Sequence, residues 1–286
     1  MISIPDRHYL LYLLLPHPLK MAWLAPASHA RLDAINRGFN TRVYSGTGAT
    51  EYDRIHRYDA AEQHDYPVRQ LIEMWGKWGY GHVLEVGAGS GYVTALLYRR
   101  AWHVLALEPV PDMQAMIRAR CRREGLQDVA VLGGAALDVD RLVPEGSLDS
   151  VVVIQSLHHM HRRGDVFEAL GRVLRPGGRL FLVEPHHNLR RVARLVRKYV
   201  KWYRPLAYRS DERNWATHDF CTRRELRALC RRGGFTDVRL STFWYPYLRR
   251  LMPDPQRRFR LERALGHIPG VRHWAGVLAL EARRAG

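Results

Sequence analysis

The 286-residue sequence has few cysteines, very little lysine and no long apolar run. Its three cysteines, Cys121, Cys221 and Cys230, contain no C-x-x-C pair, which argues against a disulfide framework and a structural zinc site and favours the cytoplasm. No apolar run approaches the roughly 18 residues that a membrane-spanning helix needs. Internal repeats are absent as well. Hydrophobic residues nevertheless make up 47% of the chain, enough to build a folded core.

Positive charge is abundant and unevenly distributed. The chain has 45 basic and 28 acidic residues, a net charge of +17. Residues 1–143 hold 16 basic and 15 acidic side chains, whereas residues 144–286 hold 29 and 13. Nearly all of the basic residues are arginine, which suits bidentate contacts to phosphate or carboxylate, although a coding bias would give the same excess. The second half of the chain is therefore expected to face an acidic partner.

Short apolar segments alternate with amphipathic ones through the middle of the chain. Strands are predicted at 82–86, 102–107, 128–132, 148–154 and 179–183, with helices at 92–100, 111–124 and 165–174. A capping box at Thr222–Glu225 predicts a helix through Cys230, and two further strands follow at 238–245 and 277–281. This alternation is typical of an α/β fold whose parallel sheet is covered on both faces.

A glycine-rich loop, Glu85-Val-Gly87-Ala-Gly89-Ser-Gly91, follows the first strand. Ligands of open α/β sheets bind at this end of the strands, where glycines allow the backbone to approach them closely. A dinucleotide site would need glycine at Tyr92, and a phosphate-binding P-loop would need Lys-Ser or Lys-Thr after Gly91. Both nucleotide sites are therefore disfavoured, and the remaining alternative to a ligand site is a glycine turn without a ligand.

The loop resembles motif I of the class I S-adenosylmethionine-dependent methyltransferases. Three further segments match this family in order: Glu108 at the end of the second strand, residues 144–159, and residues 170–180 around Pro176-Gly177-Gly178. The last segment is similar to the ubiquinone/menaquinone-biosynthesis branch, which acts on small molecules. Together the matches cover about residues 80–185 of this chain.

The resemblance implies a Rossmann-like seven-stranded sheet in the order 3-2-1-4-5-7-6, with strand 7 antiparallel, and S-adenosylmethionine as cofactor. In this family the acid at Glu108 accepts hydrogen bonds from both ribose hydroxyls. The cofactor-binding residues implied are Glu85, Gly87, Ala88, Gly89, Gly91, Glu108, Pro109, Met113, Ala135, Ala136 and Gln155. One position departs from the family: Gly134 stands where an aspartate usually binds the adenine amino group. Adenine would then be held by backbone near Ala135 or by an acid such as Asp138.

Two histidines follow the fourth strand, where a proton acceptor for the transfer would lie. Imidazole titrates near neutral pH, so His158 or His159 is predicted to act as the base. The alternative is that both histidines only pack or bond to backbone. A metal site with His161, His186 and His187 is a third possibility, but no cysteine joins them and no known ligand spacing is present, so no metal is predicted.

The remaining segments are expected to cover the ligands. Residues 1–80 are predicted to form an N-terminal helical cap, in which Tyr44, Tyr52 and Tyr58 are candidate contacts, with ordinary packing as the alternative. Residues 81–286 form the methyltransferase core, and its insertions 186–220 and 246–276 are expected to form a basic lid over the acceptor. Residues 188–204 hold seven basic residues and no acid on an amphipathic pattern, which indicates a helix that contacts a membrane surface or an acidic partner. The alternative is the solvated outer face of a helix that covers the substrate.

The predicted function is therefore methyl transfer from S-adenosylmethionine to an oxygen, nitrogen or carbon atom of a small-molecule, lipid-like or natural-product acceptor that carries an acidic group. The predicted location is cytoplasmic, with membrane association as an option. An RNA methyltransferase is the first alternative, although no separate RNA-binding module is visible. A non-catalytic protein of the same fold, acting as a basic adaptor for a membrane or an acidic partner, is the second.

Overall fold

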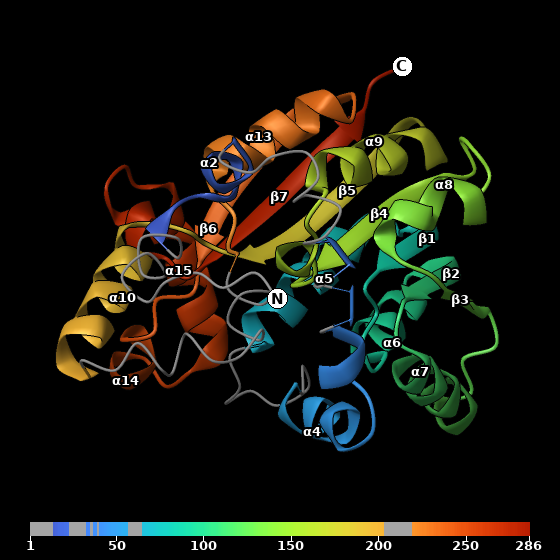
Figure 1. Cartoon of the computed structure of the whole chain (residues 1–286), viewed down its shortest axis with the longest axis horizontal. Coiled ribbons are helices and arrows are strands. Elements are labelled where there is room, and N and C mark those ends of the chain that lie inside the picture. The colour runs from blue at the N-terminus through green and yellow to red at the C-terminus, as the bar shows by residue number, and fades with distance from the viewer. Residues whose placement is uncertain (1–13, 23–32, 35–36, 39, 57–64, 203–218) are drawn as a thin grey trace.

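The computed structural model describes residues 14–22, 33–34, 37–38, 40–56, 65–202 and 219–286. A single seven-stranded sheet in the order β3-β2-β1-β4-β5-β7-β6 forms its centre (Figure 1). The strand β7 pairs antiparallel with both neighbours, and the pairs among the first five strands are parallel. The predicted strand order is confirmed. The strands are β1 (Gly81–Val86), β2 (Ala101–Glu108), β3 (Val129–Gly133), β4 (Leu148–Ile154), β5 (Leu174–Pro185), β6 (Phe235–Phe243) and β7 (Val277–Arg284).

Both faces of the sheet are buried because side chains of a strand alternate between them. On one face, Val83, Val152 and Phe181 pack against α5 (Tyr66–Trp75), α6 (Tyr92–Tyr98) and α15 (Pro255–His267). On the other face, Leu84 and Val151 pack against α8 (Val139–Leu142), α9 (Arg163–Val173) and α13 (Arg223–Arg232). The helix α7 (Pro111–Glu124) packs on β2 and β3. The continuous apolar runs seen in the sequence thus reflect a sheet that is covered twice.

Several element bounds differ from the sequence prediction; β5, for example, begins at Leu174 and not at residue 179. The strand β6 begins at Phe235, three residues before the predicted start, because a bulge with Asp237 at φ 49° separates its two paired stretches. The helix α5 lies within the predicted N-terminal cap but packs on the sheet, where the rings of Trp75 and Phe181 stack 5.0 Å apart. Its amphipathic face is therefore part of the core.

Shorter helices complete the described chain. The N-terminal region contributes α2 (His17–Ala22) and α4 (Thr47–Ile55), and the two insertions contribute α10 (Leu189–Trp202), α14 (Leu248–Leu251) and the 3-10 turn η4 (Val271–Trp274). Three more 3-10 turns are η1 (Gly76–Trp78), η2 (Ala136–Asp138) and η3 (Leu157–His159). None of the helices in the described part of the chain is long and apolar enough to cross a membrane.

A buried charge cluster attaches α2 to the core. Lys20 is 2% exposed, and its Nζ lies 2.7 Å from Asp219 Oδ1. Asp219 also pairs with His17, and its carbonyl oxygen accepts from the Arg163 guanidinium. The opposite charges of Lys20 and Arg163 hold the pKa of Asp219 well below its usual range, despite burial. Segments almost two hundred residues apart in the sequence are joined here.

Candidate active site

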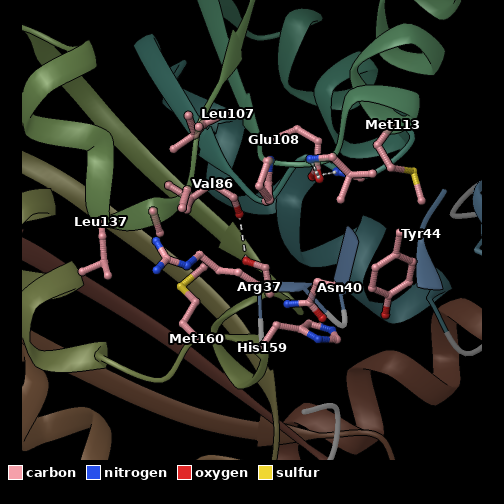
Figure 2. Close-up of a pocket in the computed structure, with 18 of the residues that line it drawn as sticks. Arg37, Asn40, Tyr44, Val86, Leu107, Glu108, Met113, Leu137, His159 and Met160 are labelled. Atoms are coloured by element: carbon pink, nitrogen blue, oxygen red, sulfur yellow. Dashed lines mark hydrogen bonds between the residues drawn. The ribbon is translucent and has the colours of Figure 1, made fainter. Parts of the chain in front are cut away.

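A cavity of about 560 Å³ lies at the carboxyl ends of β1, β2 and β4. Its floor comes from the strand ends and the loops that follow them. Its cover comes from the N-terminal region, which contributes Asp33, Arg37, Asn40, Thr41, Tyr44, Tyr52 and His56. Figure 2 shows Glu108 and Met113 on one wall, with Arg37, Asn40 and His159 across from them. This is the position at which open α/β sheets bind their ligands.

The glycine loop forms a tight wall of the cavity. Gly87 and Gly89 have φ angles of 74° and 55°, in the left-handed region that glycine adopts at little cost. A Cβ at Gly87 would lie 2.6 Å from the Ser156 Cβ, so a larger residue would not fit. Ser156 in turn donates a hydrogen bond to the Val86 carbonyl at 2.8 Å (Figure 2). The loop is therefore closely packed against the end of β4.

The Glu108 carboxylate is fixed at the cavity wall. Its Oε2 accepts from the Gly89 N–H at 2.9 Å, and its Oε1 accepts from the Val110 N–H at 3.0 Å. Glu108 is 5% exposed, and burial raises its pKa to about 7. Each oxygen keeps a second lone-pair position, so the carboxylate can still accept hydrogen bonds from a pair of ligand hydroxyls.

Glu85 was predicted to bind the cofactor, but its side chain does not line the cavity. Its carboxylate accepts a hydrogen bond from Thr94 Oγ1 at 2.5 Å, within the protein. Burial raises the pKa of Glu85 to about 8, with a further contribution from the nearby Glu108 charge. Glu85 therefore ties β1 to α6 behind the glycine loop, because its side chain alternates away from the ligand side.

The other predicted residues divide in the same way. Ala88 and Gly91 do not line the cavity. Gly87, Gly89, Glu108, Pro109, Met113, Ala135, Ala136, Gln155, His158 and His159 do. Gln155 has a φ of 51°, which is unusual for a residue with a side chain. Residues with such backbone angles occur preferentially at functional sites.

Asp138 lies on the cavity wall close to Gly134. Its Oδ2 accepts from the Ala135 N–H at 3.0 Å. Its other oxygen pairs with Arg141. Gly134 itself also lines the cavity, beside Leu107 and Leu142. The Ala135 backbone and Asp138 thus occupy the region in which the sequence analysis expected an adenine partner.

His158 forms a buried pair with a glutamate from the next strand. Its Nδ1 lies 2.7 Å from Glu184 Oε2, while Glu184 Oε1 accepts from the Leu157 N–H at 2.6 Å. When Glu184 is ionised its carboxylate only accepts, so Nδ1 carries the proton and Nε2 is left as an acceptor. Burial lowers the pKa of His158 to about 3 and raises that of Glu184 to about 7. His158 is therefore a neutral imidazole that Glu184 orients.

His159 lies beside His158, with ring centroids 4.1 Å apart and the rings tilted by 40°, and meets the Tyr44 ring edge-on at 5.8 Å. Its Nδ1 is buried and has no hydrogen-bond partner among the residues that the structure describes. Burial lowers the pKa of His159 well below its usual value. A buried polar atom without a partner at a cavity wall is a candidate contact for a bound ligand.

A second histidine–carboxylate pair at the cavity was not predicted from the sequence. His56 lines the cavity, and its Nδ1 lies 3.1 Å from Oδ2 of the fully buried Asp65. The Gln155 amide donates to the other Asp65 oxygen at 3.4 Å, and the Tyr52 ring lies 4.3 Å from the His56 ring. No motif marks this pair, because its members come from a segment that has no counterpart in the glycine-loop signature.

The lid differs from the expected one. No described residue of the insertions 186–220 and 246–276 lines the cavity, whereas Tyr44 and Tyr52 do. Tyr58 lies outside the described residues. The Tyr52 ring approaches the position of a Cβ on Gly89 to 3.1 Å, so it covers the glycine loop directly. The insertions were expected to cover the cavity because the family resemblance implies such a lid. In the structure, α10, α14 and α15 lie together at one end of the sheet (Figure 1), whereas Phe220 of the first insertion lies beside His158, with ring centroids 6.1 Å apart.

The histidines considered as metal ligands include two whose ring nitrogens are bonded to other protein groups. His187 Nε2 bonds to the Leu14 carbonyl at 2.9 Å, and His186 Nδ1 bonds to the Asn188 amide at 2.8 Å. Within the described ranges, no group of three histidine, cysteine, aspartate or glutamate side chains is arranged to hold a metal ion.

Comparison with known proteins agrees with the fold and the position of the cavity. The methyltransferase domain family matches residues 84–182, which run from β1 to β5. These strands carry the glycine loop, Glu108 and the His158 segment, in the sheet order of the class I S-adenosylmethionine-dependent methyltransferases. Residues 84–182 of this chain are therefore similar to a methyltransferase domain, within a sheet that has the methyltransferase strand order.

Relatives of this methyltransferase domain cover different parts of the chain. An uncharacterized methyltransferase of Mycobacterium tuberculosis is 40% identical over 101 residues, which are 35% of this chain and 38% of that protein. The demethylmenaquinone methyltransferase of Tropheryma whipplei is 28% identical over 174 residues, 61% of this chain and 71% of its own. The phosphoethanolamine N-methyltransferase 2 of Haemonchus contortus, solved with phosphomonomethylethanolamine and S-adenosylhomocysteine, superposes with a TM-score of 0.63 at 14% identity, over 88% of this chain and 60% of that one.

Proposed function

We propose that the protein transfers a methyl group from S-adenosylmethionine to a small-molecule acceptor. The observation that carries this proposal is the Glu108 carboxylate, which two backbone N–H groups hold at the cavity wall beside the glycine loop. This donor set fits the cofactor: a fixed acceptor for two ribose hydroxyls, and a backbone cradle that a Cβ at Gly87 would fill. Pro109, Met113, Ala135, Ala136 and Gln155 are proposed to complete the site.

S-adenosylmethionine supplies an electrophilic methyl group on a sulfonium. The residues of this chain bind and orient the acceptor and manage its proton. We assign His158 to the hydrogen bond with the nucleophilic group, because Glu184 leaves its Nε2 as an acceptor. The low pKa of His158 keeps it neutral at pH 7, so it can accept that bond without prior loss of a proton. His159, with its unpartnered Nδ1, is proposed as a second contact.

The acceptor is proposed to be lipid-like or quinone-like, with an apolar body. Leu137, Met160 and Val166 supply apolar surface to the cavity. Arg37 and Arg162 line it as well, each paired with a carboxylate, Asp33 and Asp165 respectively. The named relative that acts on demethylmenaquinone supports this class of acceptor.

Cofactor binding is tested by calorimetry with S-adenosylhomocysteine. We expect binding to the wild type and an affinity about 10- to 100-fold weaker for Glu108→Gln, because an amide offers fewer acceptor positions than a carboxylate. Glu145→Gln, in an exposed turn, is the matched control and should bind as the wild type does. Absence of binding to the wild type would favour a non-catalytic adaptor instead.

Methyl transfer is tested with methyl-labelled S-adenosylmethionine and a bacterial lipid extract, with label counted in the organic phase. We expect His158→Ala to lower turnover about 100-fold or more at saturating cofactor. His159→Ala is measured beside it, and His82→Ala, on the exposed start of β1, is the control. Wild-type rates in both active-site variants would remove the proposed role of these histidines.

A further inference from the structure

The helix α10 of the first basic insertion meets the second insertion at one end of the molecule, and none of their described residues lines the cavity. In Figure 1, α10, α14 and α15 lie together at the end of the sheet opposite α7. The helix α10 contacts η4, and α15 contacts both η4 and α14. The Arg190 guanidinium lies over the Trp244 ring at 5.0 Å, and Tyr245 Oη donates to the Val271 carbonyl at 3.4 Å. Residues 189–197 and 247–274 thus form one continuous region, called here the end surface.

Large apolar side chains are exposed on this surface. Leu251 is 80% exposed, Tyr247 73%, Leu189 60% and Trp274 52%. They come from α10, η4 and the α14 region. Single exposed apolar residues are ordinary on proteins, but several on neighbouring elements indicate an interaction surface.

Arginines surround these apolar residues. Arg194 and Arg197 are exposed on α10, and Arg249 and Arg250 are exposed on α14. None of these four forms an ion pair with any residue in the described ranges, whereas exposed arginines elsewhere, such as Arg54 and Arg232, pair with acids. No acid in the described ranges therefore neutralises these four arginines.

The acids of the end surface are used internally. Glu262 is 1% exposed and accepts from the N–H groups of Trp244 and Tyr245 at 3.2 Å each. Asp254 accepts from the N–H groups of Gln256 and Arg257 at the start of α15. Neither carboxylate is placed to compensate the arginines of α10, so the surface remains strongly positive.

We propose that the end surface docks the protein on an anionic phospholipid bilayer. The exposed leucine, tyrosine and tryptophan side chains enter the interface between headgroups and acyl chains, and the unpaired arginines contact lipid phosphates. A membrane fits this surface better than a folded acidic partner does, because its exposed apolar residues are spread over three elements and lie among exposed arginines. This proposal extends the contact predicted for residues 188–204 to the second insertion.

The test is co-sedimentation with phospholipid vesicles near physiological salt. We expect the wild type to bind vesicles of equal parts phosphatidylcholine and phosphatidylglycerol at least about tenfold more tightly than vesicles of phosphatidylcholine alone. The charge reversal Arg249→Glu/Arg250→Glu should weaken binding to the anionic vesicles about tenfold or more. Tyr247→Ser/Leu251→Ser should weaken binding to the anionic vesicles as well, because it removes apolar side chains from the interface.

Matched controls come from the opposite end of the sheet. Arg122→Glu/Arg123→Glu reverses an exposed pair on α7, and Trp102→Ser removes a ring that is 72% exposed on β2. Both should bind anionic vesicles as the wild type does. Binding of S-adenosylhomocysteine, measured for every variant, reports folding and separates this proposal from the proposed activity.

The proposal is overturned by equal binding of the wild type to both kinds of vesicle, or by no binding to either. Equal losses in the end-surface and control variants would also overturn it, because net charge alone would then explain the binding. Salt-sensitive retention of RNA without vesicle binding would assign the surface to nucleic acid instead.

Discussion

Three buried glutamates at the ends of β1, β2 and β5 show how position separates residues of the same type. Glu85 accepts from Thr94, Glu184 from Leu157 and His158, and Glu108 from two backbone N–H groups. Burial raises the pKa of all three. Only Glu108 lines the cavity, so only this carboxylate can exchange a proton when a ligand binds there.

Binding of S-adenosylhomocysteine is expected to depend on pH through Glu108. The pKa of Glu108 in the free protein is about 7, and hydroxyl donors from a ribose favour the ionised carboxylate. The affinity should therefore fall as the pH drops below about 7, by up to about tenfold per pH unit, and protons should be released on binding. Calorimetry in two buffers of different ionisation enthalpy measures both effects.

The matched variant for this prediction is Glu108→Gln, which has no proton to release at this position. Between pH 5 and 8, the range in which Glu108 titrates in the wild type, the affinity of this variant should vary much less than that of the wild type. The same slope in both proteins would show that another group carries the pH dependence.

At the scale of single elements, the start of α13 joins local capping to a long-range ion pair. Thr222 Oγ1 accepts from the Glu225 N–H at 3.1 Å, and Glu225 Oε2 accepts from the Thr222 N–H at 3.3 Å. The other Glu225 oxygen lies 2.6 Å from Nη1 of Arg163, which is 1% exposed. The capping box that the sequence indicated thus also orients a buried carboxylate toward α9.

Replacement of Thr222 by alanine should lower the free energy of unfolding by about 1 kcal/mol, within a range of about 0.5 to 2 kcal/mol, because the Glu225 N–H loses its acceptor. Urea denaturation followed by tryptophan fluorescence measures the change. Thr222→Ser keeps the hydroxyl and should retain most of the stability. Equal losses in the two variants would contradict the capping role.

At the scale of the whole molecule, buried histidines and buried glutamates give opposite pH dependences. Burial lowers the pKa of His158 and His186 to about 3 and that of His187 to about 4, from an ordinary 6.5. Below pH 6.5 the unfolded chain therefore binds protons that the folded protein does not bind, so the histidines destabilise the fold as the pH falls from 6.5. Glu85, Glu108 and Glu184 act in the other direction: above their ordinary 4.5 the fold keeps protons that the unfolded chain releases.

The ligand-free protein is thus expected to be most stable between about pH 4.5 and 6.5, with losses on both sides. Urea midpoints measured from pH 4 to 8 test this expectation, because the pKa values of these buried groups lie mostly within that range. Glu184→Gln should reduce the loss above pH 6.5 and leave the acid side unchanged. A stability maximum at pH 8 would contradict the balance.

The sheet order was expected only from the family resemblance. The sequence by itself determined the strands, the glycine loop and Glu108. These features are local: apolar runs mark strands, glycines mark the turn, and Glu108 sits at a predictable strand end. The two histidines after β4 also follow from this local order. Their chemistry does not, because burial sets it, and burial depends on the rest of the chain.

Only the tertiary structure decided which segments surround the cavity. Glu184 pairs with His158 across 26 residues of sequence, and α2 reaches Asp219 across 199. The N-terminal segment covers the cavity, whereas the helices α10, α14 and α15 of the basic insertions lie at the end of the sheet opposite α7 (Figure 1). Charge and amphipathic pattern show that a helix has a polar and an apolar face. They do not show which neighbour either face meets, because that depends on packing between elements distant in the sequence.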